Sequence, residues 1–135
     1  MILEKQIHAT KEQFKKMIET VGMDEPVTMV NILKFKNEKV EGPLTGAEVY
    51  ARYGQKALPY LKKAQARLVW RGNVKATLIA DDQDTPDVML IVSYPSLKHF
   101  IDMVTDPEYV KISEDRTMAL EYGGLYVCDT EYPVG

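Results

Sequence analysis

Arg116 carries the strongest chemical signal in the sequence. On a helical wheel it falls between Tyr109, Ile112 and Leu120, in the middle of an apolar stripe. A guanidinium keeps its charge inside a protein, so at such a position it needs a carboxylate or an anionic ligand. Two roles are therefore open. Arg116 forms a structural salt bridge, for instance to Asp87 or a glutamate, or it clamps an anionic small molecule.

Asp87 and His99 are the two candidates for moving a proton. Asp87 opens a nearly continuous apolar run over residues 87–94, where burial would raise the pKa of its carboxyl, although a carboxylate at a strand end is more often solvated or capping. His99 lies on the first turn of a predicted helix. It could serve as a general base or an axial haem ligand if a cavity adjoins it, and is otherwise a surface histidine.

A second group of residues could orient a ligand. Asn31 interrupts an apolar strand face, and a buried amide either stitches neighbouring backbone or points into a cavity. Tyr53 lies on a tyrosine-rich helical side, and Tyr94 closes a central strand beside a helix cap that favours anions. Trp70 could be a platform for a planar ligand, or interface or core. The ligand-binding candidates are thus Asn31, Tyr53, Trp70, Tyr94 and Arg116.

Capping and periodicity predict the elements that must position these side chains. Helices are expected to begin after four capping residues: Thr10, Thr45, Ser96 and Asp106. Pro59 should kink or interrupt the second helix, and the glycine pair at 123–124 should end the fourth. Strands are predicted at 27–36, 67–80, 87–94 and 125–129, with a bulge, turn or bend at 72–73 and an acidic hairpin loop at 81–86.

This order of elements predicts a single α+β domain. After a helical extension at residues 1–26, residues 27–135 read strand, helix, strand, strand, helix, strand, the βαββαβ order of ferredoxin-like folds. Right-handed crossovers put both main helices on one face of the sheet. Because the first and third strands are apolar on both sides, the other face needs a cover, and we expect a homodimer joined through its sheets as a dimeric α/β barrel. The leading helix is the alternative cover, which would leave a monomer.

Composition narrows the class of function. The chain has 135 residues, 45% of them hydrophobic, and a net charge of −3 with no basic stretch, so nucleic acid is an unexpected partner. No apolar run is long enough to span a bilayer, and no signal peptide is evident, which predicts a cytoplasmic protein without membrane contact. One cysteine, Cys128, allows no internal disulfide, and the two histidines and scattered carboxylates lack metal-ligand spacing. We expect neither a metal nor a tightly bound cofactor.

Several segments together resemble the proteins grouped as domain of unknown function 1330. They are Met29–Lys36, Tyr50-x-x-Tyr53, Leu90–Ser96, Phe100, Met103, Asp106–Tyr109 and Arg116, within a match from about residue 27 to 127. The resemblance implies a dimeric α/β barrel, in a superfamily that also holds small monooxygenases, muconolactone isomerase-like enzymes and haem-degrading proteins. It implies no settled activity. Pro86 stands where many relatives have a tryptophan, and the stretch before Thr10 is an addition.

Three functions are consistent with these residues. The first is a homodimeric small-molecule-binding protein that acts as a cofactor-independent enzyme of monooxygenase or isomerase type on an anionic or aromatic metabolite. The second is a noncatalytic ligand-binding or sensing module. The third is a haem-binding or haem-degrading protein, because an asparagine on the first strand and a histidine on the helix after the third strand resemble the haem-degrading members.

Overall fold

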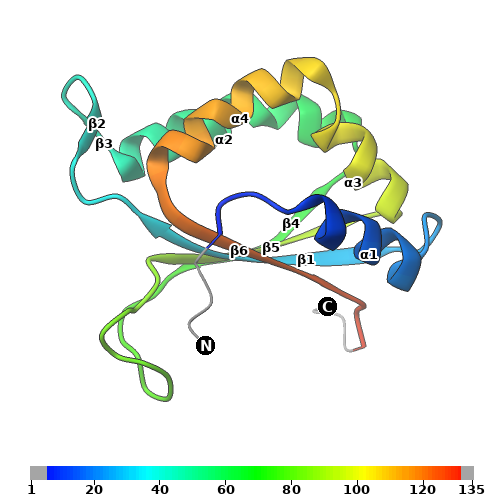
Figure 1. Cartoon of the computed structure of the whole chain (residues 1–135), viewed down its shortest axis with the longest axis horizontal. Helices are drawn as coiled ribbons and strands as arrows, with labels where there is room; N and C mark the ends of the chain where they lie inside the picture. Colours follow the sequence, from blue (N-terminus) through cyan, green and yellow to red (C-terminus); the bar gives the residue numbers. More distant parts are fainter. Residues whose placement is uncertain (1–5, 132–135) are drawn as a thin grey trace.

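The computed structural model describes residues 6–131 and contains one four-stranded antiparallel sheet in the order β4–β5–β1–β6 (Figure 1). The strands are β1 (Val27–Phe35), β4 (Arg67–Asn73), β5 (Val88–Tyr94) and β6 (Leu120–Cys128). A short hairpin of β2 (Lys39–Glu41) and β3 (Leu44–Thr45) stands apart from it. This is the predicted ferredoxin-like α+β fold.

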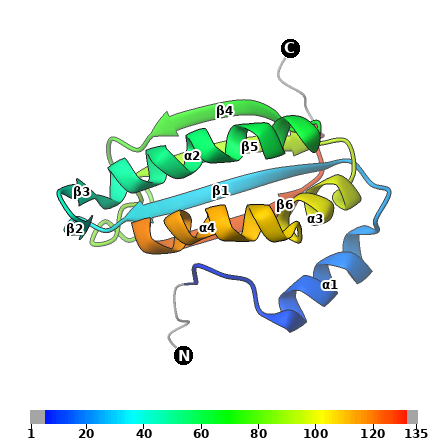
Figure 2. The same ribbon diagram turned by 90° about the horizontal axis from the view of Figure 1, so that it is seen from above.

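Both long helices cover the same face of the sheet, as the right-handed crossovers require. Helices α2 (Gly46–Lys63) and α4 (Pro107–Ala119) lie side by side across it, with α3 (Leu97–Val104) leading into α4 (Figure 2). All four predicted capping residues accept a backbone N–H at the start of their helix. Pro59 does not interrupt α2, which continues to Lys63.

Strand register separates the two faces of the sheet. Met29 pairs with Val92 and Val127, and Leu33 pairs with Val88, which places these side chains in the core beneath the helices. The alternate positions face away from the helices. They form an apolar set that we call the open face: Val30, Ile32, Trp70, Met89, Ile91 and Tyr126. Trp70 is 52% exposed and Tyr126 62% exposed.

Helix α1 (Lys11–Val21) leaves the open face uncovered. It lies outside α3 and α4 (Figure 2), and its side chains Phe14, Met17 and Ile18 pack against the core cluster that contains Val27 and Met29. The interpretation of α1 as a cover for the second sheet face is therefore wrong, because its apolar stripe is satisfied on the helical side.

Three predicted boundaries need correction. Strand β4 ends at Asn73 rather than at residue 80, because its partner β5 begins at Val88 and residues 74–87 have no strand to pair with. The bulge lies between Leu68 and Trp70 instead of at 72–73. Helix α4 ends at Ala119, and the glycine pair at 123–124 lies inside β6 opposite β1, where ladder pairing competes successfully with a helix-ending signal.

Candidate functional site

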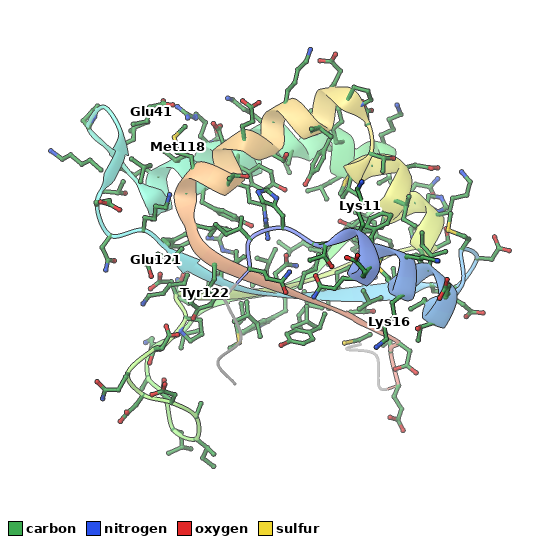
Figure 3. The ribbon with its side chains drawn as sticks, viewed as in Figure 1. Lys11, Lys16, Glu41, Met118, Glu121 and Tyr122 are labelled. Atoms are coloured by element: carbon green, nitrogen blue, oxygen red, sulfur yellow. The ribbon has the colours of Figure 1, made fainter. Side chains whose placement is uncertain are left out.

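Tyrosine side chains from three elements gather between the helix layer and the sheet. Tyr50 and Tyr53 project from α2, Tyr94 from β5 and Tyr109 from α4. The Tyr50 and Tyr53 ring centroids are 5.3 Å apart, and the Tyr53 and Tyr109 hydroxyls share a hydrogen bond. We call this set the tyrosine cluster. Side chains project into this layer from the helices and from the sheet (Figure 3).

The hydroxyls of the tyrosine cluster stay protonated at neutral pH. Burial raises the pKa of Tyr50 to about 12 and also raises those of Tyr53, Tyr94 and Tyr109. The phenols of Tyr53 and Tyr50 oppose ionisation of Tyr94, so these three groups lie within electrostatic reach of one another. The cluster can therefore donate hydrogen bonds to an acceptor, but it is a poor source of a base.

Two of these hydroxyls border space that water can reach. Tyr50 and Tyr94 are each buried as residues, and neither hydroxyl has a hydrogen-bond partner within residues 6–131. Every fully buried polar side-chain atom in that part of the chain does have a partner. The Tyr50 and Tyr94 hydroxyls must therefore touch solvent-sized space, which makes them available to a ligand.

Arg116 faces this interior from the last turn of α4. Its Nη1 donates to the Ile7 carbonyl at 2.7 Å, and it favours ionisation of Tyr50, Tyr53 and Tyr109 electrostatically. Gly123 gives it room, because a Cβ there would lie 2.6 Å from Arg116 Nη2. Within the described chain no carboxylate pairs with Arg116, so the predicted salt bridge to Asp87 or a glutamate is not formed there.

Asn31 lies on the helix-facing side of β1, on the same face as Met29 and Leu33. Its Nδ2 donates to the Leu90 carbonyl at 3.4 Å, so its amide is partly engaged with neighbouring backbone. Register aligns Asn31 with Leu90 and Arg71 across the sheet. Arg71 is a second cation that acts on Tyr50. Sequence reasoning missed it because an arginine on an edge strand has no distinguishing pattern.

Asp87 anchors backbone and does not face Arg116. Its Oδ2 accepts from Phe35 N at 2.8 Å, its own N–H donates to the Leu33 carbonyl at 2.8 Å, and its Oδ1 lies 3.8 Å from Lys34 Nζ. These contacts tie the start of β5 to the end of β1. A carboxylate so engaged with the backbone is held in a structural role.

His99 lies at the other end of β5. The Ser96 hydroxyl lies 2.7 Å from its Nδ1, and the ring lines a cavity of about 310 Å³ with Tyr60, Lys63 and Asp102 among its walls. Asp87 precedes β5 and His99 follows it on α3, and the seven residues of β5 span roughly 23 Å at about 3.3 Å each. The two proton-transfer candidates therefore lie too far apart to serve one reacting atom. Asn31 pairs with Leu90 in the middle of β5, whereas His99 follows the end of that strand.

Of the remaining candidates, Tyr94 belongs to the tyrosine cluster and Trp70 does not. Tyr94 stacks edge-on against Phe100, with ring centroids 5.3 Å apart. Trp70 lies on the open face, where its ring covers Gly72 so closely that a Cβ there would lie 2.5 Å from the indole. The predicted ligand platform is thus on the opposite side of the sheet from Arg116.

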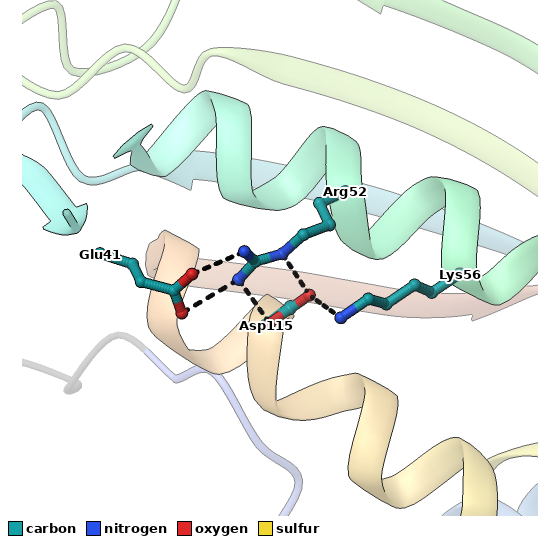
Figure 4. A network of polar contacts seen from close by, with 4 residues as sticks. All are labelled: Glu41, Arg52, Lys56 and Asp115. Atoms are coloured by element: carbon teal, nitrogen blue, oxygen red, sulfur yellow. Dashed lines mark hydrogen bonds and ion pairs between the residues drawn. The ribbon is translucent and has the colours of Figure 1, made fainter. Parts of the chain in front are cut away.

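A polar network fixes the helices above the site (Figure 4). Arg52 on α2 donates from Nε and Nη2 to Asp115 on α4, both at 2.9 Å, and from Nη1 to Glu41 at 2.6 Å. Lys56 Nζ adds a 3.1 Å contact to Asp115. These hydrogen bonds hold the pKa values of the Asp115 and Glu41 carboxyls below their usual range. This pairing could not be predicted from the sequence, since Arg52 and Lys56 lie off the apolar stripe of α2.

Within residues 6–131, no group of three or more histidine, cysteine, aspartate or glutamate side chains is arranged to hold a metal ion. None of the helices in that range is both long and apolar enough to cross a membrane.

These features define an α+β protein of ferredoxin-like topology with an arginine and a tyrosine cluster beneath its helices. Residues 40–128 match the model of the family described as domain of unknown function (DUF1330), and the chain belongs to that family. No functionally curated protein matches the sequence.

Solved structures agree on the fold. The chain is similar to a protein of unknown function from Rhodopseudomonas palustris, with 29% identity, a TM-score of 0.86, and coverage of 96% of this chain and 100% of that one. A dimeric protein of unknown function with a ferredoxin-like fold from Bacteroides fragilis shares 15% identity at a TM-score of 0.53, covering 80% of this chain and 99% of that one. A cofactor-independent oxygenase from Streptomyces nogalater shares 14% identity at a TM-score of 0.52, covering 81% and 96%. At such identities the last two show the fold alone.

Proposed function

We propose that this protein is a homodimeric, small-molecule-binding protein that takes an anionic, carboxylate-bearing aromatic metabolite between its helices and its sheet. The observation that carries the proposal is Arg116, a guanidinium that faces the protein interior and is paired with a backbone carbonyl instead of a carboxylate. An arginine offers planar, bidentate recognition of a carboxylate. The ligand would complete the charge compensation that Arg116 lacks.

The surrounding residues have matching chemistry. The free hydroxyls of Tyr50 and Tyr94 would donate to acceptor atoms of the ligand, and the tyrosine rings would pack against an aromatic ring. Tyr53 orients the cluster through its bond to Tyr109, and Asn31 forms part of the floor. Because Asp87 and His99 lie beyond opposite ends of β5, binding without a dedicated proton-transfer pair is favoured over the enzyme hypothesis. A cofactor-independent reaction would have to use the tyrosines.

Calorimetry with matched ligands tests this site. The probes are benzoate and 4-hydroxybenzoate, with methyl benzoate as the uncharged control. Loss of a charged hydrogen-bond partner costs about 1.5–3 kcal/mol, so Arg116→Gln should weaken acid binding by roughly 10- to 150-fold and leave ester binding unchanged. Arg67→Gln is the matched control, because Arg67 pairs with Ser93 on the opposite face of the sheet. If no carboxylate binds the wild type, or if Arg116→Gln binds it equally well, the proposal is wrong.

The exposed apolar side chains of the open face support the homodimer in this proposal. Exposed apolar side chains such as Trp70 and Tyr126, together with the strand residues between them, form a surface that a second copy would bury. Sedimentation velocity should find a dimer that Trp70→Glu dissociates. Leu58→Glu is the control, because Leu58 is 54% exposed on α2, on the helical side. A wild-type monomer at micromolar concentration would contradict this part of the proposal.

A further inference from the structure

Residues 74–87 form a long loop between β4 and β5 that projects from the sheet. Figure 1 shows it, in green, leaving the sheet on the side opposite the helices. We call these residues the arm. It extends beyond the open face in the direction from which a second copy would approach.

The base of the arm is fixed to the domain. Val74 N donates to the Asp87 carbonyl at 2.9 Å, and Lys34 Nζ donates to the Thr85 carbonyl at 2.9 Å. The hydroxyls of Thr77 and Thr85 share a hydrogen bond that links the outgoing and returning chains. These contacts involve both the outgoing and the returning segment of the arm, and they hold it in its outward position.

The arm presents two adjacent aliphatic side chains to solvent. Leu78 is 93% exposed and Ile79 is 91% exposed, far more than any other large hydrophobic side chain described as exposed. Single exposed apolar residues are common, but two neighbours on a fixed projection, next to a bare apolar sheet face, form a docking feature.

We propose that the arm docks onto a second copy of this chain, with Leu78 and Ile79 buried against the partner subunit. The inference rests on the homodimer proposed above and adds a second contact region to it. Continuity with the open face favours this occupant, because a copy seated there must meet the arm. Three aspartates follow Leu78 and Ile79 in the arm, and their carboxylates disfavour an anionic lipid surface as the occupant: Asp81, Asp82 and Asp84.

Sedimentation equilibrium of the double variant Leu78→Ser/Ile79→Ser tests the arm. Burial of two aliphatic side chains predicts that the dimer dissociation constant rises by about 100-fold or more in this variant. The control is Leu58→Ser/Val110→Ser, which removes two half-exposed apolar side chains from α2 and α4 and should leave the constant unchanged. Both substituted positions of the test variant are exposed, so its circular dichroism spectrum should match that of the wild type.

A fluorescence experiment separates failure of the arm from failure of the dimer. In a Cys128→Ser background, bimane attached at Leu78→Cys should shift to shorter wavelength as protein concentration rises and the dimer forms. If the wild type dimerises while the bimane emission stays constant and the double serine variant dimerises normally, the arm inference is wrong and the sheet-mediated dimer stands. If the wild type is monomeric at all concentrations, both proposals fail.

Discussion

Gly46 and Gly54 lie in the same helix and should respond to alanine in opposite directions. Gly54 lies inside α2, where alanine is a better helix former than glycine by about 0.5–1 kcal/mol, whereas Gly46 is the first residue of the helix. A Cβ at Gly54 would meet nothing within 4 Å. A Cβ at Gly46 would lie 2.5 Å from the Lys36 carbonyl oxygen and 2.6 Å from the Ala119 carbonyl oxygen. Helix propensity therefore decides the effect of alanine at Gly54, whereas steric overlap decides its effect at Gly46.

The size of the Gly46 effect follows from the atoms involved. Lys36 N donates to the Ala119 carbonyl at 2.9 Å, so an added methyl group would enter the hydrogen bond that joins β1 to the end of α4. Overpacking costs about 1–3 kcal/mol and loss of such a bond about 1 kcal/mol. Together these costs predict that Gly46→Ala lowers the free energy of unfolding by about 2–4 kcal/mol. Gly54→Ala should raise it by about 0.5–1 kcal/mol.

Urea denaturation of the wild type and both variants, at one protein concentration, measures these values. The equilibrium m-value should be the same in all three proteins, because the surface exposed on unfolding does not change. A Gly46→Ala variant as stable as the wild type would refute the reasoning, since it would mean that the chain can move Lys36 and Ala119 apart without cost.

Other predictions concern charge and the site. Asp115→Asn should lower the free energy of unfolding by about 2–3 kcal/mol at pH 7. Since the folded state lowers the pKa of this carboxyl, chiefly through its hydrogen bond to Arg52, that stabilisation is full above the ordinary pKa of 3.8 and is lost as pH falls below it. Urea titrations at pH 7 and pH 3 should show the gap between variant and wild type closing, and an undiminished gap at pH 3 would count against the ion pair. Burial raises the pKa of Tyr50 to about 12, so stability should decrease as pH rises above 10, and the absorbance titration of Tyr50→Phe should lack one late phenol. Gly123→Ala should displace the Arg116 guanidinium and weaken carboxylate binding in calorimetry as Arg116→Gln does; unaltered binding would show that this contact does not position Arg116.

Much of the fold could be predicted because its signals are local. Thr10, Thr45, Ser96 and Asp106 all cap helices as expected, since a cap depends on residues within one turn. The glycine pair at 123–124 misled the prediction because its conformation is set by pairing with β1, which is distant in sequence. The same reason explains the overlong second strand, for which residues 74–80 have suitable side chains but no partner.

The candidate site also depends partly on local signals and partly on contacts between distant segments. The inward direction of Arg116 and Asn31 follows from helical and strand periodicity, so the sequence by itself determined that polar groups enter the core. Only the tertiary structure decided which groups meet there. In the structure, Arg116 lies near the tyrosine cluster, and Trp70 lies on the open face. Asp87 and His99 lie beyond opposite ends of β5. Periodicity assigns a side chain to a face, whereas its neighbours depend on strand order, register and helix packing, which are settled between segments far apart in the chain.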